Sequence, residues 1–152
     1  MKVTTKLPKR NNATNGRKAH NDNQYVKIGR VRMNSWINEK LPVADILIAE
    51  RELVHISHKR ASILNKLGLD SFAYVSTIVA NCSEIYIDDE THAYLFVLKN
   101  ANDNPTAHCA VVEIELAFLN QKRVYIIRTA HPESRKRLSQ NTLLCAKAAS
   151  HK

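Results

Sequence analysis

The spacing of apolar residues changes several times along the chain, and each change predicts a different kind of element. Residues 25–32 alternate apolar with basic side chains, a pattern typical of a strand. Helical spacing begins near residue 57, and its first apolar stripe stops at Gly68, a residue common at helix C-termini. A second stripe follows an N-cap at Asp70 or Ser71, so the pattern predicts two consecutive helices.

After residue 82 the period changes from 3.6 to 2, which indicates a sheet. Four strands are predicted, at residues 84–88, 93–99, 108–118 and 122–129. The last two are joined by a tight turn at 119–121, and His131-Pro132 marks the end of the final strand. Beyond this proline, Leu138, Leu143 and Leu144 predict a helix over residues 133–147.

This order of elements predicts an α+β fold in which N-terminal helices pack on one face of a four-stranded, or slightly larger, antiparallel sheet. We assign residues 25–152 to one such domain, with its functional core in residues 45–135. Residues 1–24 are polar, rich in Asn and Lys and without apolar periodicity, which predicts a disordered arm. The uncovered face of the sheet is where we expect a site.

Positive charge is concentrated in the N-terminal segment. The chain has 152 residues and a net charge of +9, and residues 1–32 alone hold nine basic residues against one acidic residue. The rest of the chain is therefore nearly neutral. A basic arm of this kind either solubilises the domain or binds phosphate groups, and both interpretations are compatible with a nucleic-acid partner.

Composition excludes several classes of protein. With three glycines the chain has no glycine-rich phosphate loop, so the common nucleotide-cofactor enzymes are excluded and no cofactor is expected. The three cysteines lack metal-ligand spacing, and their odd, sparse number is typical of reduced thiols. No apolar run approaches the ~20 residues that span a membrane. We therefore expect a cytoplasmic site of action with no membrane partner.

Polar side chains gather at the end of the last predicted strand. Strict alternation places Ile127, Thr129 and His131 on one face, with Thr129 and His131 about 7 Å apart. Lys99 ends a neighbouring strand and Lys122 begins the last one. Cleavage of an RNA phosphodiester needs a base for the 2′-hydroxyl, an acid for the 5′-oxygen and cations for the phosphate charge. These residue types suit that reaction, and none of the roles requires a metal.

Two further histidines, His55 and His58, lie three residues apart where the helical region begins. This spacing puts both on one face of a helix. Paired histidines are metal ligands in some proteins, but Glu50 and Glu52 do not form an HExxH arrangement with them, so no metal is expected.

Four segments carry a resemblance that covers about half of the chain. They are VHISHKR (residues 54–60), LNKLGLDSFAYVSTIVANCSEIY (64–86), AYLFVLK (93–99) and VYIIRTAHPES (124–134). The first feature is a histidine-bearing helix. It is followed by a second helix that ends before an Asn-x-x-Glu-Ile transition, and then by a four-stranded meander whose last strand ends in Thr. This order resembles the fold group of the barnase, EndoU, colicin and RelE-type ribonucleases, its phage and toxin branches in particular.

The resemblance implies a metal-independent endoribonuclease, often a toxin or phage effector, delivered in some cases from a phage or another cell. It implies that His55 or His58 is a helix-borne acid or base and that Thr129 supplies a hydroxyl. Lys99 or Arg128 would bind phosphate, with Arg60 and Lys122 as further substrate-binding cations. The implied partners are RNA and an acidic immunity or antitoxin protein.

Two other functions stay open at this point. A non-catalytic nucleic-acid-binding module would use the arm and the sheet to bind phosphate, with sheet aromatics such as Tyr94 and Tyr125 stacking on bases. A phage or host protein-interaction module would use the same domain without contacting nucleic acid. The sequence does not identify the RNA substrate or the oligomeric state.

Overall fold

The computed structural model describes residues 3–6, 24–31, 37, 41–99 and 108–147. Eight strands form one sheet in the order β1-β2-β3-β7-β6-β5-β4-β8. The strands are β1 (Val3–Lys6), β2 (Gln24–Val31), β3 (Ala44–Ala49), β4 (Glu84–Ile87), β5 (Tyr94–Leu98), β6 (His108–Leu119), β7 (Lys122–Ser134) and β8 (Thr142–Ala146). The helices are α1 (Glu50–Lys59), α2 (Ala61–Leu67), α3 (Ser71–Asn81) and α4 (Arg135–Leu138).

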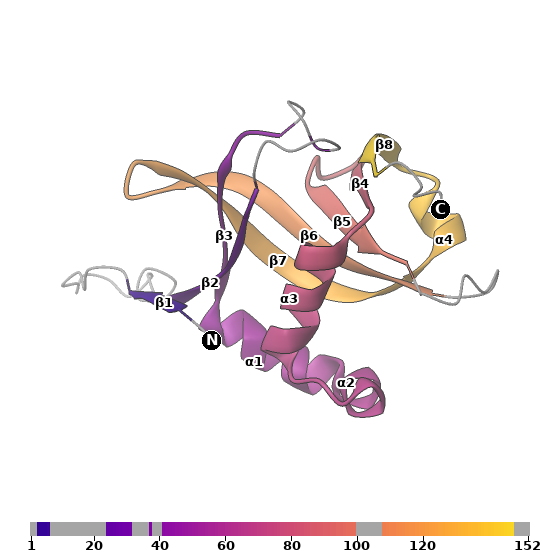
Figure 1. Ribbon diagram of the computed structural model, residues 1–152, viewed down its shortest axis with the longest axis horizontal. Helices are drawn as coiled ribbons and strands as arrows, with labels where there is room; N and C mark the ends of the chain where they lie inside the picture. The colour runs from indigo at the N-terminus through magenta and orange to yellow at the C-terminus, as the bar shows by residue number, and fades with distance from the viewer. Residues whose placement is uncertain (1–2, 7–23, 32–36, 38–40, 100–107, 148–152) are drawn as a thin grey trace.

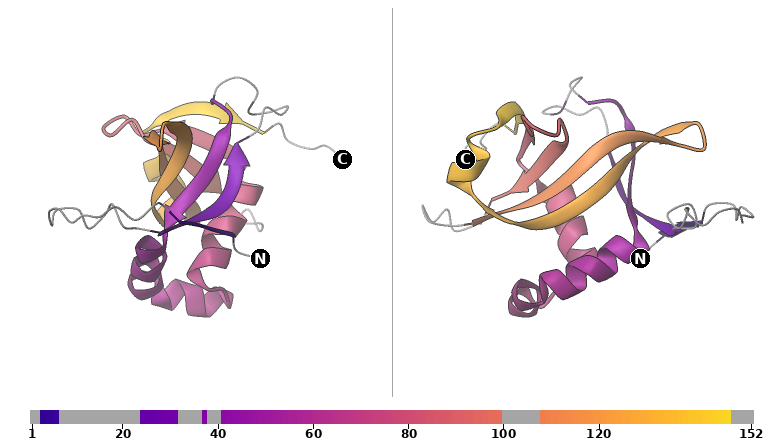
Figure 2. Two further views of the ribbon diagram at one scale, coloured as in Figure 1. Left: turned by 90° about the vertical axis from the view of Figure 1, so that its left-hand side faces the viewer. Right: turned by 180° about the vertical axis from the view of Figure 1, so that it is seen from behind.

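The path of the chain explains the strand order (Figure 1). After β3, the chain leaves the sheet through α1, α2 and α3 and re-enters it at β4 on the far side. It then returns through β5 and β6 to β7, which lies parallel to β3, while all other neighbouring strands are antiparallel. The three helices lie together on one side of the sheet, as the turned views also show (Figure 2).

The core lies between the sheet and these helices. Alternate residues of the central strands point toward α3, where Val75 and Ile78 are buried against them. The buried strand residues in this cluster include Ile46, Ile48, Ile85, Phe96, Val112, Ile114, Tyr125 and Ile127. The residues between them point to the opposite side, which we call the open face.

The open face is partly covered by α4. Leu138 of this short helix packs against Leu95, Val97 and Val111, which form a second, smaller apolar cluster. Ser134 caps α4, since its Oγ accepts the Arg137 N–H at 3.2 Å. Because α4 covers only one end of the open face, polar residues beside it stay accessible.

Several predicted elements are present at the expected places. Asp70 is the N-cap of α3, with its Oδ1 accepting the Ala73 N–H at 2.8 Å. Gly68 ends α2 in the left-handed conformation, with φ of 70°. The strands β4 to β7 form the predicted antiparallel meander, and β2 matches the strand predicted at residues 25–32.

The predicted fold class is nevertheless wrong. The sheet has eight strands, not four, and the helices are inserted between β3 and β4 instead of preceding the sheet. The sequence ADILIA of β3 is a nearly continuous apolar run, typical of a strand that is covered on both faces and pairs in parallel. Such a run has no clean period of 2, so the sequence permits a strand within residues 42–56 without establishing it.

Two predicted boundaries also fail. The helix expected at residues 133–147 is replaced by the end of β7, the single turn of α4, and β8, which pairs with β4. Three scattered leucines are compatible with either a helix or a strand. The strand forms because its backbone pairs with the edge of β4 that β5 leaves free. The first helix starts at Glu50, seven residues before the predicted start at Ser57, because Leu53 and Ile56 extend its buried stripe.

Of the predicted N-terminal arm, Val3–Lys6 form β1 and pair with β2. Residues 1–2 and 7–23 lie outside the described residues. Within the described part of the chain, no helix combines the length and apolarity needed to cross a membrane.

We predict that Asp70→Ala lowers the free energy of unfolding by about 1 kcal/mol, because the Ala73 N–H loses its acceptor. Urea unfolding followed by circular dichroism measures this change. Asp70→Asn keeps an acceptor oxygen and is expected to lose much less. Ser62→Ala on the exposed side of α2 is the control, and equal stability of Asp70→Ala and this control would contradict the prediction.

Candidate active site on the open face

An irregularity in the pairing of β6 with β7 sets the orientation of the candidate residues. Ile114 pairs with Ile127, but Glu113 pairs with Thr129, so Arg128 is an extra residue without a partner in the ladder. Such a β-bulge re-aims the side chains that follow it. Ile127 therefore points into the core while Thr129 lies beside Glu113. The predicted alternation, which put Ile127 on the same face as Thr129 and His131, is corrected by this bulge.

A pocket of about 350 Å³ lies on the open face next to α4. Glu113 on β6 and His131 on β7 both line it, as do Glu133 and Arg137. The β4–β5 turn forms one side, with Asp88, Asp89 and Glu90. The pocket thus brings a carboxylate and an imidazole together from adjacent strands, with a guanidinium at its margin.

His131 is held by its backbone surroundings. Its side chain is 24 % exposed, and Nδ1 lies 2.8 Å from the carbonyl oxygen of Pro132 and 3.7 Å from Oε1 of Glu133. A carbonyl oxygen only accepts hydrogen bonds, so Nδ1 carries the proton in this contact. Nε2 is then the atom that gains or loses a proton.

Glu133 also holds the guanidinium at the pocket margin. Its Oε2 lies 3.3 Å from Nε of Arg137, four residues further along the chain. The Arg137 side chain is 74 % exposed, so this ion pair contributes little to stability. The contact instead holds the guanidinium beside the pocket.

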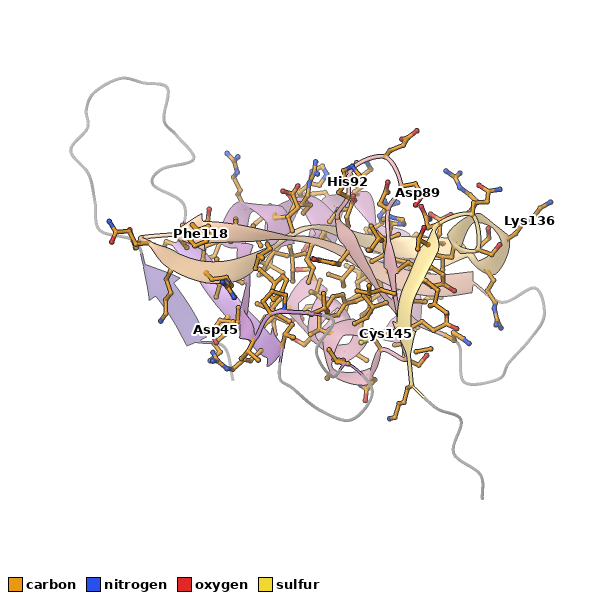
Figure 3. All side chains as sticks on the ribbon, turned by 90° about the horizontal axis from the view of Figure 1, so that it is seen from above. Asp45, Asp89, His92, Phe118, Lys136 and Cys145 are labelled. Atoms are coloured by element: carbon orange, nitrogen blue, oxygen red, sulfur yellow. The ribbon has the colours of Figure 1, made fainter. Side chains whose placement is uncertain are left out.

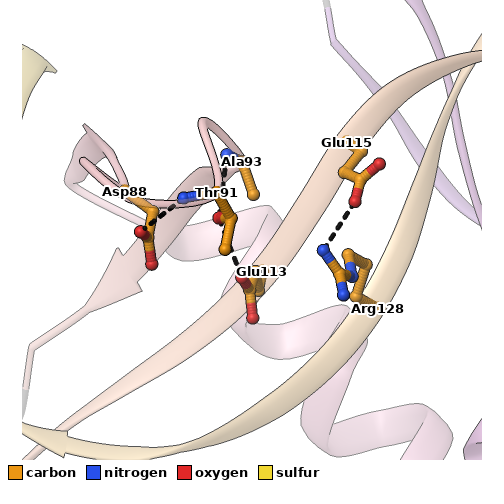
Figure 4. A network of polar contacts seen from close by, with 6 residues as sticks. All are labelled: Asp88, Thr91, Ala93, Glu113, Glu115 and Arg128. Atoms are coloured by element: carbon orange, nitrogen blue, oxygen red, sulfur yellow. Dashed lines mark hydrogen bonds and ion pairs between the residues drawn. The ribbon is translucent and has the colours of Figure 1, made fainter.

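Glu113 contacts an ordered turn (Figure 4). The Asp88 carboxylate accepts the N–H groups of Glu90 at 2.8 Å and Thr91 at 3.0 Å. Thr91 Oγ1 in turn donates to Oε2 of Glu113 at 3.5 Å. The hydrogen bond from the Thr91 backbone lowers the pKa of Asp88; burial opposes this shift but does not reverse it. The turn therefore fixes one side of the pocket with a charged carboxylate at its centre.

The cations predicted to bind phosphate do not line this pocket. Lys99 Nζ lies 3.0 Å from Oε2 of Glu84. Arg128 Nη1 lies 2.7 Å from Oε2 of Glu115, a contact that Figure 4 also shows. Both therefore already have carboxylate partners on the sheet. Arg60 is half-buried at the C-terminus of α1, and Lys122 is exposed at the start of β7.

The histidine pair of α1 does not line the pocket. His55 and His58 are both exposed, on a helix that contacts β3 and β7 through its other side. Of the four residues expected to be catalytic, Thr129 and His131 are thus together on the open face, and the two helical histidines are apart from the pocket lining.

Of the residues that line the pocket, the sequence indicated His131 as a site residue and missed the others, including Glu113, Glu133 and Arg137. For Glu113 an indication exists, because counting back from the 119–121 turn places it opposite Arg128, one residue from its true partner Thr129. Glu133 and Arg137 fell in the segment taken for a helix, where their ion pair fits equally well.

Cys82 is not a candidate nucleophile. Burial, helped by the nearby Cys145, raises the pKa of its thiol to about 12, so it stays protonated at neutral pH. Among the described residues, no group of three or more His, Cys, Asp or Glu is arranged to hold a metal ion. No protein-family model, curated protein or solved structure matches the chain. Its function is therefore argued from this geometry.

The Asp88 carboxylate makes stability depend on pH. Its folded-state pKa lies below the ordinary value of 3.8, so it contributes stability above that pH and loses it as the pH falls through the folded pKa. We predict that Asp88→Ala costs about 1–2 kcal/mol at neutral pH and clearly less at about pH 3. Urea unfolding at both pH values tests this, and a cost that does not change with pH would contradict it.

Proposed function

We propose that this protein is an endoribonuclease that cleaves RNA by attack of a 2′-hydroxyl on the neighbouring phosphorus. The observation that carries the proposal is that Glu113 and His131 line one pocket on the open face. A carboxylate and an imidazole on neighbouring strands supply the base and the acid that this reaction needs. The resemblance to toxin ribonucleases supports the same chemistry, and it alone supports a toxin or phage-effector role with an acidic inhibitor protein.

The proposed step uses both groups at once. Glu113 takes the proton of the 2′-hydroxyl as the 2′-oxygen bonds to phosphorus, and Nε2–H of His131 protonates the departing 5′-oxygen. The products are a 2′,3′-cyclic phosphate and a free 5′-hydroxyl. Glu113 and His131 are diagonal neighbours on adjacent strands of the β6–β7 ladder, a relation that places their Cα atoms about 7–8 Å apart. This separation leaves room for a phosphate between the two side chains.

Thr129 and Arg137 complete the proposed site. Thr129 pairs with Glu113 and carries a hydroxyl that donates to a non-bridging phosphate oxygen. The exposed guanidinium of Arg137 stabilises the negative charge that develops on the phosphorane. Glu133 lies between Arg137 and His131 and contacts both side chains.

The charge of the pocket sets a condition on this function. Asp88, Asp89, Glu90, Glu113 and Glu133 face it, against the single guanidinium of Arg137. Such a pocket does not attract a phosphate by its own field. Affinity for RNA therefore has to come from cations outside the pocket, and cleavage is expected to weaken with added salt.

The test is cleavage of a fluorescent single-stranded RNA in excess EDTA. We predict that Glu113→Gln and His131→Ala each lower the rate about 10²–10⁴-fold, because each removes one proton-transfer group. His55→Ala and His58→Ala on exposed positions of α1 are the matched controls and are expected to stay near the wild-type rate. Thermal unfolding of every variant separates loss of chemistry from loss of fold.

Three results would count against this proposal. A 2′-deoxyribose at the cleavage site must block the reaction, and cleavage that persists there would refute the 2′-hydroxyl mechanism. If His55→Ala or His58→Ala is inactive while His131→Ala cleaves normally, the acid–base group lies on α1. RNA that stays intact at high protein concentration would refute the ribonuclease. The nucleic-acid-binding module and the protein-interaction module would then be the two functions still open.

A further inference from the structure

The β6–β7 hairpin continues beyond the rest of the sheet. β5 pairs with β6 only as far as Ile114, and β3 pairs with β7 only from Val124 onward. Past these points the two strands pair only with each other, out to Leu119 and Lys122, and the ribbon projects beyond its neighbours (Figures 1 and 2). We call residues 118–123 the hairpin tip.

The tip has a defined conformation. Asn120 and Gln121 have φ of 56° and 66°, the left-handed values of a two-residue turn that matches the twist of the strands. A two-stranded ribbon gains little stability by itself. The tip therefore adds an ordered projection that the hydrophobic core does not require.

The tip presents an aromatic ring together with positive charge. Phe118 is 70 % exposed, the most exposed of the large apolar side chains that the structure describes, and lies at the end of the hairpin (Figure 3). It pairs with Arg123, and Lys122 is the next exposed cation. Among the described residues, neither cation has an ion-pair partner. Lys27 and Arg30, in contrast, share the carboxylate of Asp45.

These side chains border a hollow. It has a volume of about 380 Å³ and is lined by Phe118, Gln121, Lys122 and Arg123 from the hairpin and by Arg30 and Asp45 from the neighbouring strands. The carboxylate of Asp45 is the single acidic group in this lining, and its contacts with Lys27 and Arg30 offset its charge. The hollow thus combines an open aromatic face with an excess of positive charge.

We propose that the hairpin tip binds single-stranded RNA, with a base stacked on Phe118 and phosphates held by Lys122 and Arg123. Aromatic rings beside cations complement the faces of bases and the charge of the backbone. The identity of the ligand as RNA rests on the proposed function. The acidic pocket requires cations elsewhere, and the tip supplies two that no carboxylate in the described chain neutralises.

The position of the tip makes its effect depend on substrate length. Phe118 lies five residues from Glu113 along β6, about 17 Å at 3.4 Å per residue, and this odd spacing places the two side chains on opposite faces of the strand. An RNA strand in contact with both therefore passes around the edge of the hairpin, where the two strands pair only with each other. A strand that reaches both places must extend several nucleotides beyond the scissile phosphate. A dinucleotide in the pocket would not touch the tip at all.

Binding of an uncleavable ligand tests the inference without catalysis. The probe is a fluorescein-labelled 12-nucleotide single strand with 2′-O-methyl riboses, measured by fluorescence anisotropy. We predict that Phe118→Ala weakens binding about 5- to 150-fold, the range measured for loss of one stacked base. Phe118→Tyr retains a ring and is expected to bind like wild type, whereas Phe118→Leu is not. Val54→Ala, at another exposed apolar residue, is the control.

Salt dependence tests the two cations separately. Each phosphate contact adds about 0.7 to the slope of log affinity against log salt for a single strand, so Lys122→Ala/Arg123→Ala should reduce the slope by about 1.4. Lys66→Ala on α2 is the charge control. In the cleavage assay the double variant should slow cleavage of a 12-nucleotide RNA and leave a dinucleotide unaffected.

The outcomes separate this inference from the proposed function. If wild-type protein does not bind the probe, or if Phe118→Ala and the double variant bind it normally, the inference is overturned even when RNA is cleaved. If Phe118→Leu binds like wild type, the ring does not stack, and the inference again fails. Tip-dependent binding without RNA cleavage would retain the tip as a nucleic-acid site and refute the ribonuclease.

Discussion

The long antiparallel pairing of β6 with β7 is the constraint on which the rest of this structure depends. Its middle section carries Val112, Ile114 and Tyr125 into the core against α3, so the hairpin cannot shift without exposing them. The bulge at Arg128 lies in the same ladder and turns Thr129 away from that core. One ladder therefore fixes the core, the orientation of the pocket residues and the direction of the hairpin tip.

The helices decide which face of the sheet is available for chemistry. α1, α2 and α3 cover one face with apolar side chains, so polar residues on the central strands are confined to the other. There α4 anchors itself through Leu138 and leaves Glu113 and His131 accessible beside it. The same short helix places Arg137 near Glu133, which links the guanidinium to the imidazole.

Local patterns predicted the local structure well. The N-cap at Asp70, the end of α2 at Gly68, the 119–121 turn and the meander all follow from neighbouring residues. What the sequence left open or missed depends on distant partners. Residues 44–49 form a strand because they pair in parallel with β7, and β8 forms because it pairs with the edge of β4. The candidate site shows the same division, since the shared face of Thr129 and His131 followed from their spacing. For Glu113, counting back from the 119–121 turn comes within one residue of its partner Thr129, and the remaining residue is the bulge at Arg128, which the local pattern did not indicate.

The distribution of charge connects the pocket to the tip. Lys99 and Arg128, two of the cations that the sequence suggested for binding phosphate, already pair with Glu84 and Glu115. A pocket lined by several carboxylates raises the energy of any phosphate entering it, unless the substrate is also held elsewhere. Under the proposed function, binding energy from a distant part of the RNA offsets this repulsion at the reacting phosphate. Separate acidic and basic regions would then favour long strands over short ones by electrostatics alone.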